Sequence, residues 1–252
     1  MRDTNFDSRF LHLQENVYAQ DKGRIRLTLL EDDLLDFVPE FSTKRLKILD
    51  AGGGAGHFSR LCAHRGHLAV LCDISDEMIA LAARENDKAG LQKQITLLHL
   101  GLHEPGLNEH GPYDLVALHG VVEWMADPES AIHHACSLVR PGGILSLLVF
   151  NRDKLLLKQG INGMLHSAAH QKNKPRGHLT PPNGLSPRTT RNLLDTHEGS
   201  LLLQSGIRIF NGFFREITPD LTPDQWLSQE RLYSRQEPFS GLGEHSHFLW
   251  RR

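Results

Sequence analysis

The glycine-rich stretch 47–56, Lys-Ile-Leu-Asp-Ala-Gly-Gly-Gly-Ala-Gly, constrains the fold more than any other part of this 252-residue chain. Residues 47–51 form an apolar run typical of a strand, four glycines occupy the next five positions, and a helical pattern begins at His57. Glycine has no Cβ, so this backbone can turn sharply and approach a ligand closely. The first turn of the following helix offers free N–H groups. A strand, a glycine turn and a helix in this order therefore predict a ligand site in an α/β fold.

The spacing of the glycines separates two ligand classes. A dinucleotide site reads G-x-G-x-x-G, but His57 or Ser59 occupies the third glycine position when the pattern starts at Gly52 or Gly54. The other pattern, D-x-G-x-G-x-G, is matched in full by residues 50–56. The structural alternative is a plain turn between a strand and a helix, which seldom needs four glycines.

The composition is that of an ordinary globular protein, with 39% hydrophobic and 23% charged residues. The formal net charge is −2, so a nucleic acid would have to be bound by a local basic patch. Cys62, Cys72 and Cys136 lie in apolar surroundings without a C-x-x-C pair, which favours buried reduced thiols and a cytoplasmic protein. The N-terminal residues lack an apolar signal core, and no stretch reaches the roughly 18 apolar residues of a membrane span. We therefore expect no membrane partner.

Hydrophobic periodicity and turn signals place further elements along the chain. Helices are expected within residues 5–40, from 57 to about 65, from 75 to about 88, from 128 onward, and at 186–194 as the last helix. Strands are expected at 47–51, 68–73, 95–99, 113–119, up to 150 after a Pro-Gly-Gly turn, 201–210 and 245–250. This order is that of nucleotide-binding α/β folds.

Residues at the ends of the expected strands are candidates for ligand binding. Asp73 ends the second strand, 23 residues after Asp50, where a carboxylate can accept both hydroxyls of a ribose. Leu102 would pack on a base and His103 would hydrogen-bond near it, although the residue types also fit an ordinary loop. His119 ends a central strand and would face the ligand, but a lone histidine is often structural. Asp73 could also cap the next helix.

Basic residues are unevenly distributed. Arg26 either binds a carboxylate of the ligand through its planar guanidinium or belongs to a solvated face. Between Arg152 and Arg191 the chain has eight Lys and Arg residues and one Asp, with several prolines and glycines, which predicts a basic, loop-rich insertion at about 151–185. This insertion is either a flexible solvated segment or a lip that contacts nucleic-acid phosphates through Lys172, Lys174 and Arg176. The spacing of its histidines is poor for a metal site, and we expect no metal.

Aromatic residues alternate with arginines in two C-terminal stretches, 213–216 and 231–239. This pattern suits stacking on an unstacked base and contact with its phosphates. It fits core aromatics with surface arginines equally well. The candidates for contact with a nucleic-acid substrate are Arg215, Tyr233 and Arg235.

Three features resemble the class I S-adenosylmethionine-dependent methyltransferases in order and spacing: the D-x-G-x-G-x-G loop, Asp73, and the L-x-R-P-G-G-x-L block at 138–145. Further stretches resemble the bacterial family of tRNA 5-carboxymethoxyuridine methyltransferases: 5–7, 16–18, 22–26, 50–54, 122–124 and 235–238. The resemblance implies a Rossmann-like α/β fold with a mostly parallel, twisted seven-stranded sheet, an antiparallel last strand and helices on both faces. It also implies a helical extension at 1–45 before a methyltransferase domain at 46–252.

The resemblance further implies a reaction. The family transfers the methyl group of S-adenosylmethionine to the carboxylate of 5-carboxymethoxyuridine at the tRNA wobble position, so the anticodon loop of tRNA would be the partner. The implied cofactor residues are Arg26, Gly52, Gly53, Gly54, Asp73, Leu102, His103 and His119. A carboxylate, with an ordinary pKa of about 4, is ionised at neutral pH and needs no general base, so no catalytic residue is expected. Arg215 or Arg235 would orient the acceptor. The alternatives are a methyltransferase for a quinone or small carboxylic acid, and a non-catalytic module that binds the cofactor.

Overall fold

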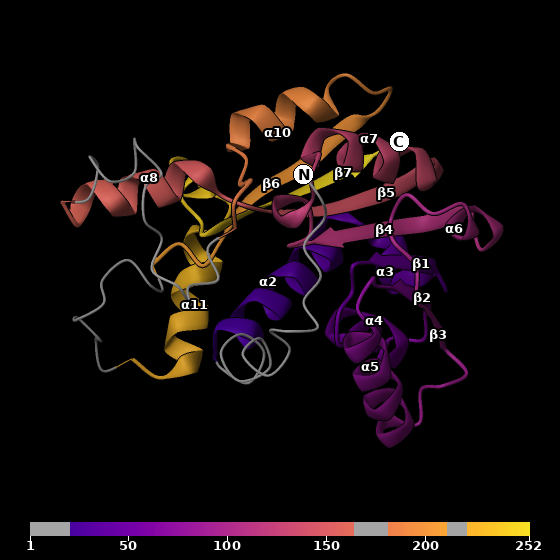
Figure 1. The fold of residues 1–252 in the computed structure, drawn as a ribbon. Helices are drawn as coiled ribbons and strands as arrows, with labels where there is room; N and C mark the ends of the chain where they lie inside the picture. Colours follow the sequence, from indigo (N-terminus) through magenta and orange to yellow (C-terminus); the bar gives the residue numbers. More distant parts are fainter. Residues whose placement is uncertain (1–20, 164–180, 211–220) are drawn as a thin grey trace.

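The computed structural model describes residues 21–163, 181–210 and 221–252 (Figure 1). Seven strands in these residues form one sheet in the order β3-β2-β1-β4-β5-β7-β6. The strands are β1 (Lys47–Ala51), β2 (Leu68–Cys72), β3 (Ile95–Leu98), β4 (Tyr113–His119), β5 (Val139–Phe150), β6 (Ser200–Ile207) and β7 (His245–Arg251). The pairs from β3 to β5 are parallel, whereas β7 is antiparallel to both β5 and β6. The predicted Rossmann-like sheet with an antiparallel last strand is therefore confirmed.

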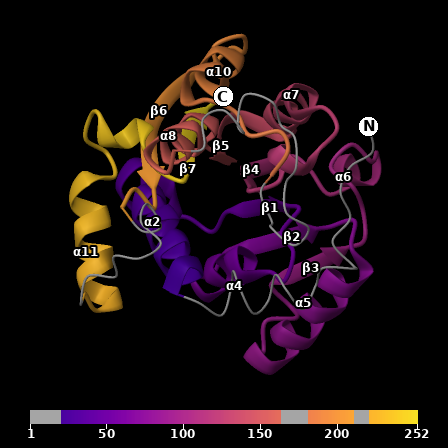
Figure 2. The same cartoon turned by 60° about the vertical axis from the view of Figure 1, so that its left-hand side comes forward.

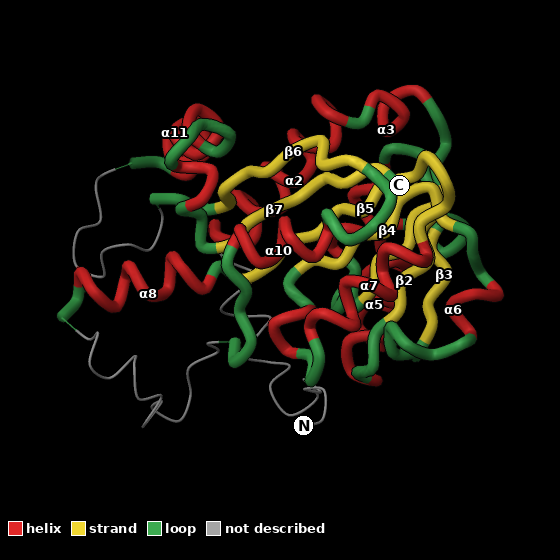
Figure 3. The backbone as a smooth tube through the Cα atoms, turned by 90° about the horizontal axis from the view of Figure 1, so that it is seen from above, coloured by secondary structure: helices red, strands yellow, loops and turns green. Residues whose placement is uncertain are grey.

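Helices cover both faces of the sheet (Figure 3). One face carries α2 (Asp21–Phe37), α3 (Pro39–Thr43), α4 (His57–His64) and α5 (Asp76–Ala89). The other carries α6 (Gly106–Glu109), α7 (Pro128–Leu138) and α10 (Pro187–Leu194), which pack on the largest apolar cluster. Two more helices, α8 (Arg152–Ile161) and α11 (Pro223–Tyr233), lie near the β6 edge, and α11 runs beside α2 (Figure 2). None of the described helices is long and apolar enough to cross a bilayer.

Local sequence explains where the central helices begin and end. The Ser75 hydroxyl accepts a hydrogen bond from the N–H of Met78 at the start of α5, and Gly90 ends that helix in the left-handed conformation. Asp127 caps α7, whose first residue is Pro128. These boundaries agree with the expected ones. The three cysteines are free and buried, as their apolar surroundings predict.

Two expectations about the C-terminal half are wrong. The helix at 186–194 is not the last one, because α11 follows at Pro223–Tyr233 and begins with a capping box between Thr222 and Gln225. The insertion is not loop-rich from its start, because residues 152–161 form α8. Asn151 caps this helix, and Lys154 is buried beneath it. The cap and the buried lysine stem stabilise a helix in a stretch whose polar composition had indicated a loop. The helices expected within residues 5–40 are found from Asp21 onward, and residues 1–20 lie outside the described part.

Candidate active site

The glycine loop after β1 is tied to the end of β2. The N–H groups of Gly52 and Gly53 donate to the carbonyl oxygen of Cys72 at 2.8 and 3.2 Å. The N–H of Gly54 donates to Oδ2 of Asp73 at 2.9 Å. Gly52 and Gly54 have φ of 65° and 53°, in the left-handed region that glycine adopts without strain. The loop therefore holds the Asp73 carboxylate at the carboxyl edge of the sheet.

Asp50 supports this loop from below. Its carboxylate is buried and accepts hydrogen bonds from the N–H of Ser59 at 3.1 Å and from its hydroxyl at 2.6 Å. Burial raises the pKa of Asp50 to about 6. A Cβ on Gly53 would lie 2.7 Å from Cγ of Asp50, so this position has no room for a side chain. The first residue of the D-x-G-x-G-x-G pattern thus shapes the loop and the first turn of α4.

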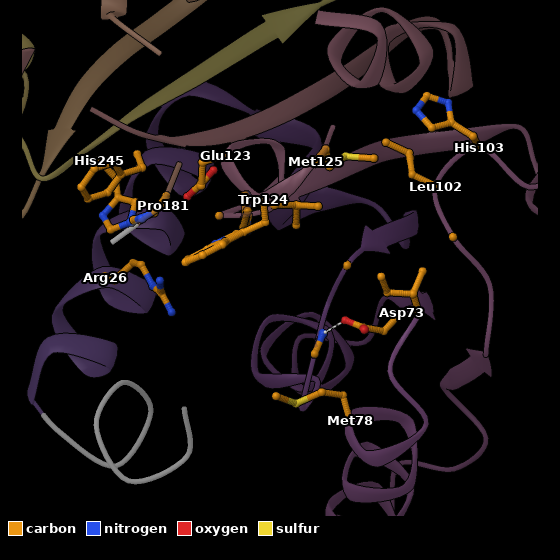
Figure 4. A pocket seen from close by; sticks show the side chains of 18 of the residues that line it. Arg26, Asp73, Met78, Leu102, His103, Glu123, Trp124, Met125, Pro181 and His245 are labelled. Carbon is orange, nitrogen blue, oxygen red and sulfur yellow. Dashed lines mark hydrogen bonds between the residues drawn. The ribbon is translucent and has the colours of Figure 1, made fainter. Parts of the chain in front are cut away.

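A cavity of about 450 Å³ opens above the loop, at the carboxyl ends of the central strands (Figure 4). It is lined by seven of the eight predicted cofactor residues: Arg26, Gly52, Gly54, Asp73, Leu102, His103 and His119. Gly53 lines an adjoining cavity of about 290 Å³, which shares Arg26, Gly52 and His119 with the first. Residues from α2 and from the segments at the ends of β1 to β4 therefore surround two neighbouring cavities that share three lining residues.

One end of the cavity combines a carboxylate with apolar walls. Oδ1 of Asp73 accepts from the N–H of Ser75 at 2.9 Å, which fixes the orientation of the carboxylate. Met78 and Leu102 are buried and lie on either side of Asp73 in Figure 4, with His103 farther out. A carboxylate can accept two neighbouring hydroxyls, and the apolar walls can enclose a flat ring. This end fits a nucleoside.

His119 lies where the two cavities meet. Its Nε2 is 2.7 Å from the Ser146 hydroxyl, and its buried Nδ1 has no hydrogen-bond partner in the described residues. Burial, together with the nearby charge of Arg26, holds the pKa of His119 well below its ordinary value. The imidazole is therefore neutral at physiological pH and can accept or donate one hydrogen bond at Nδ1.

The other end of the cavity is lined by polar residues to which the sequence analysis gave no role. Glu123, Glu244 and His245 each have a buried side-chain atom without a partner in the described residues: Oε2, Oε2 and Nδ1. Trp124 lies between this end and Asp73, and Glu123 and His245 gather beside Pro181 (Figure 4). Buried polar atoms are normally paired, so these atoms indicate a polar ligand.

The pKa of Glu123 makes a testable prediction about stability. Burial raises this pKa to about 7, although backbone hydrogen bonds and Arg26 oppose the shift. The folded chain then binds the proton more tightly than the unfolded chain, so the free energy of unfolding should fall as pH rises from about 4.5 to 7. Glu123→Gln has no carboxyl group at this position, so its free energy of unfolding should not show this fall. We expect its stability relative to wild type to rise by up to about 3 kcal/mol between pH 5 and pH 7.5 in urea unfolding.

The matched control for this prediction is Glu129→Gln, at an exposed position in the first turn of α7. Its stability relative to wild type should change little over the same pH range. If Glu123→Gln shows the same flat profile as the control, Glu123 is ionised in the folded protein at pH 5 and the polar end of the cavity carries one more negative charge.

Arg208 completes the polar end. It is the one non-glycine residue in the described ranges with a positive φ, at 61°. Its carbonyl accepts from the N–H of Glu244 at 3.1 Å, and the buried Glu230 accepts from the N–H of Ile209 at 2.6 Å. Lys154 donates to the carbonyl of Ile209. Strained backbone persists where neighbours impose it, and it gathers at functional sites.

The structure does not bring Arg235 and Tyr233 to the cavity. Arg235 donates to Asp33 at 2.8 Å and to Asp36 at 2.6 Å, and its guanidinium lies over a phenylalanine ring of α2. These ion pairs fasten the segment just after α11 to α2, so the structure does not place Arg235 where its expected role in orienting the acceptor requires. Tyr233 packs against Phe239, with ring centroids 5.0 Å apart, which is the core-aromatic alternative. The other substrate candidates lie outside the described residues: Arg215, Lys172, Lys174 and Arg176.

Comparisons with known proteins agree with this geometry. Residues 23–194 match the methyltransferase domain family. The chain is 32% identical over 254 residues to the tRNA 5-carboxymethoxyuridine methyltransferase of Escherichia coli K12, covering 100% of this chain and 97% of that protein. It is 26% identical over 207 residues to the human mitochondrial ubiquinone biosynthesis O-methyltransferase, covering 79% of this chain and 55% of that protein.

Solved structures share the fold. The magnesium protoporphyrin IX methyltransferase from Synechocystis PCC 6803 with bound SAH superposes with a TM-score of 0.65 at 18% identity, covering 98% of this chain and 96% of that one. An O-methyltransferase family protein from Burkholderia thailandensis superposes with a TM-score of 0.59 at 18% identity, covering 98% and 63%. At these identities the likeness concerns the fold alone.

Proposed function

The chain belongs to the class I methyltransferases, and from this premise we propose that it transfers the methyl group of S-adenosylmethionine to the carboxylate of 5-carboxymethoxyuridine at the tRNA wobble position. The product would be the methyl ester. The observation that carries the proposal is the 32% identity to the Escherichia coli enzyme, which extends over 100% of this chain and 97% of that protein. The match to the human ubiquinone enzyme covers only 55% of that protein.

The residues of the cavity fit the proposed cofactor. Asp73 would accept the ribose hydroxyls, and Met78 and Leu102 would enclose the adenine. A Cβ on Gly52 would lie 2.6 Å from Val121, which lines the same cavity, so only glycine allows the loop to pack this closely against that wall. Arg26 faces this space from α2 and would pair with the carboxylate of the methionine part (Figure 4). When bound, S-adenosylmethionine would supply a methyl group on a positively charged sulfur. An ionised carboxylate can attack that methyl carbon directly, and the sulfur leaves as a neutral thioether.

The charges at the polar end suit an anionic acceptor. Arg208 lines this end with a guanidinium that can pair with a carboxylate, whereas Arg26 is assigned to the methionine part of the cofactor. Glu123, with its pKa near 7, is only partly charged at neutral pH and so repels an anion less than an ordinary glutamate would. Trp124 offers a ring face to an unstacked base. The contribution of the chain would be positioning, which can lower a barrier by about 7–11 kcal/mol, together with exclusion of water from a step that removes charge.

The experiment is a transfer assay with S-adenosylmethionine labelled in its methyl group. We expect label on tRNA that carries the carboxymethoxy base, and none on the same tRNA without that group. The label should be released by mild alkali, which hydrolyses an ester but not an N-methyl or ribose O-methyl group. Equal labelling of both tRNAs, or labelling of a small carboxylic acid in preference to tRNA, would contradict the proposal. Cofactor binding without transfer to either would select the non-catalytic alternative.

A further inference from the structure

Polar side chains cross the sheet beneath His119, on the face that α2 covers. The register pairs His119 of β4 with Leu148 of β5, Leu148 with His247 of β7, and His247 with Ser205 of β6. Ser146 lies two residues before Leu148 and so points to the same face. Asp33 of α2 lies over this row. A buried sheet face is normally apolar, so four polar side chains here call for an explanation.

Hydrogen bonds join these side chains into one chain, which we call the relay: His119, Ser146, His247 and Asp33. The Ser146 hydroxyl is 2.7 Å from Nε2 of His119 and 2.9 Å from Nε2 of His247. Nδ1 of His247 is 2.8 Å from Oδ2 of Asp33. Ser146 and His247 are fully buried, and Asp33 is 2% exposed. The relay therefore links the cavity to α2 without contact with water.

The charge at the inner end of the relay is compensated. Burial alone would raise the pKa of Asp33, but its hydrogen bonds to His247 and Ser205 and the charge of Arg235 lower it overall. Asp33 is thus a carboxylate, and Arg235, 2.8 Å away, supplies the opposite charge. A second buried cation at His247 is not needed for compensation, and burying an ionised imidazole is costly.

A neutral His247 determines the direction of every bond in the relay. An ionised carboxylate only accepts, so Nδ1 of His247 carries the proton and its Nε2 is bare. The Ser146 hydroxyl must then donate to His247, and its oxygen must accept from Nε2–H of His119. A neutral imidazole has one N–H, so Nδ1 of His119 is left as an acceptor.

We propose that Ser146, His247 and Asp33 are positioning residues that hold His119 as its Nε2–H tautomer, so that its buried Nδ1 accepts a hydrogen bond from an N–H or O–H donor of the bound ligand. Resting on the proposed function, the donor is the α-ammonium group of the methionine part of the cofactor. Its carboxylate would pair with Arg26, which lines both cavities with His119. Through the relay, the Asp33 carboxylate of α2 makes Nδ1 of His119 a hydrogen-bond acceptor, and the cavity therefore favours a ligand with an amine.

The alternative proton arrangement makes the opposite prediction. If His247 were an imidazolium, its Nε2–H would donate to Ser146, Ser146 would donate to His119, and Nδ1–H of His119 would be a donor that repels an ammonium group. The groups that face the two histidines are Arg26 and Asp33 from α2, Phe58 from α4 and Ser146 from β5. Of these, only Asp33 favours protonation of His247, and Arg235 already opposes its charge.

The first test is nitrogen NMR of histidine side chains in the ligand-free protein, which does not depend on the reaction. The signals of His119 are assigned by their loss in His119→Gln. We expect a protonated Nε2 and a bare Nδ1 at pH 7.5. Ser146→Ala should give a mixture of tautomers. Ser240→Ala is the matched control, because Ser240 is also buried but its hydroxyl donates to Glu237, outside the relay. It should keep the wild-type signals. A protonated Nδ1 in wild type would overturn the proposal.

The second test is calorimetric binding of S-adenosylhomocysteine and of its analogue without the α-amino group. Ser146→Ala should weaken binding of the amine-bearing ligand by about tenfold, which is typical of one hydrogen bond to a charged group, and leave the deaminated ligand unchanged. Equal weakening of both ligands would reduce Ser146 to a structural role and overturn the assignment. Failure of S-adenosylhomocysteine to bind wild type would instead contradict the proposed cofactor, while the NMR result would stand.

Discussion

Replacing Arg208 by glycine should lower kcat/KM for the carboxymethoxy tRNA by about a hundredfold or more, yet leave the protein as stable as wild type. The fall in activity is expected because the proposed acceptor is an anion and the variant lacks a cation at the buried polar end. Removing one partner of such a charge pair costs about 2–5 kcal/mol. Stability should be kept because Arg208 has φ of 61°, a conformation that costs a non-glycine residue about 1 kcal/mol and glycine very little. Steady-state kinetics and thermal unfolding measure the two effects.

Arg208→Lys tests whether the positive charge of Arg208 or the planar shape of its guanidinium matters for activity. It keeps the cation but not the planar fork that binds a carboxylate through two hydrogen bonds, so we expect partial activity between that of wild type and Arg208→Gly. Arg191→Ala, which removes an exposed arginine of α10, should leave activity unchanged. Normal turnover by Arg208→Gly would remove Arg208 from acceptor binding. A large fall in its melting temperature would show that the guanidinium holds the wall of the cavity and not the ligand.

Gly53→Ala should weaken cofactor binding by about a hundredfold. Its Cβ would lie 2.7 Å from both Cγ and Oδ2 of Asp50 and 2.9 Å from Leu71. Asp50 is buried and bonded to Ser59, so it cannot move aside, and the loop must shift instead. Overpacking of this kind costs about 1–3 kcal/mol, and the displaced loop carries the Gly54 N–H group that donates to Asp73. Calorimetric titration with S-adenosylhomocysteine measures the change.

Gly241→Ala is the matched control for Gly53→Ala. Gly241 also lies in a turn, and a Cβ there would meet no atom within 4 Å. It should bind the cofactor as wild type does. If Gly53→Ala also binds normally, the loop adapts to a side chain, and the glycine spacing is then not required by contact with Asp50.

The residues that line the Asp73 end of the cavity could be predicted from sequence because their signals are local. The glycine loop, Asp73 and the Ser75 cap each lie within a few residues of a strand end, and parallel strands bring such ends to one edge of the sheet. Helix α11 was missed although Thr222 and Gln225 have the spacing of a capping box. The sequence analysis interpreted residues 231–239, which begin in the last turn of this helix, by their aromatic and basic side chains and did not consider that they could be helical.

The polar half of the site could not be predicted, because it depends on pairings distant in sequence. Arg208 and Glu244 meet only because Ile207 pairs with His245 across two antiparallel strands. The relay requires His247 to align with Leu148, about a hundred residues earlier. Hydrophobic patterns indicate that a segment is a strand but not which residues of another strand it faces. The division between an extension at 1–45 and a domain at 46–252 stays a prediction.

The position of β7 between β5 and β6 has a consequence for folding during translation. Strands β1 to β5 can assemble as soon as they emerge, whereas β6 has no neighbour in the sheet until β7 has been translated. Glu244, His245 and His247 arrive with that strand. A nascent chain would therefore form the Asp73 end of the cavity first and the polar end last, so that a prematurely released fragment would lack Glu244, His245 and His247.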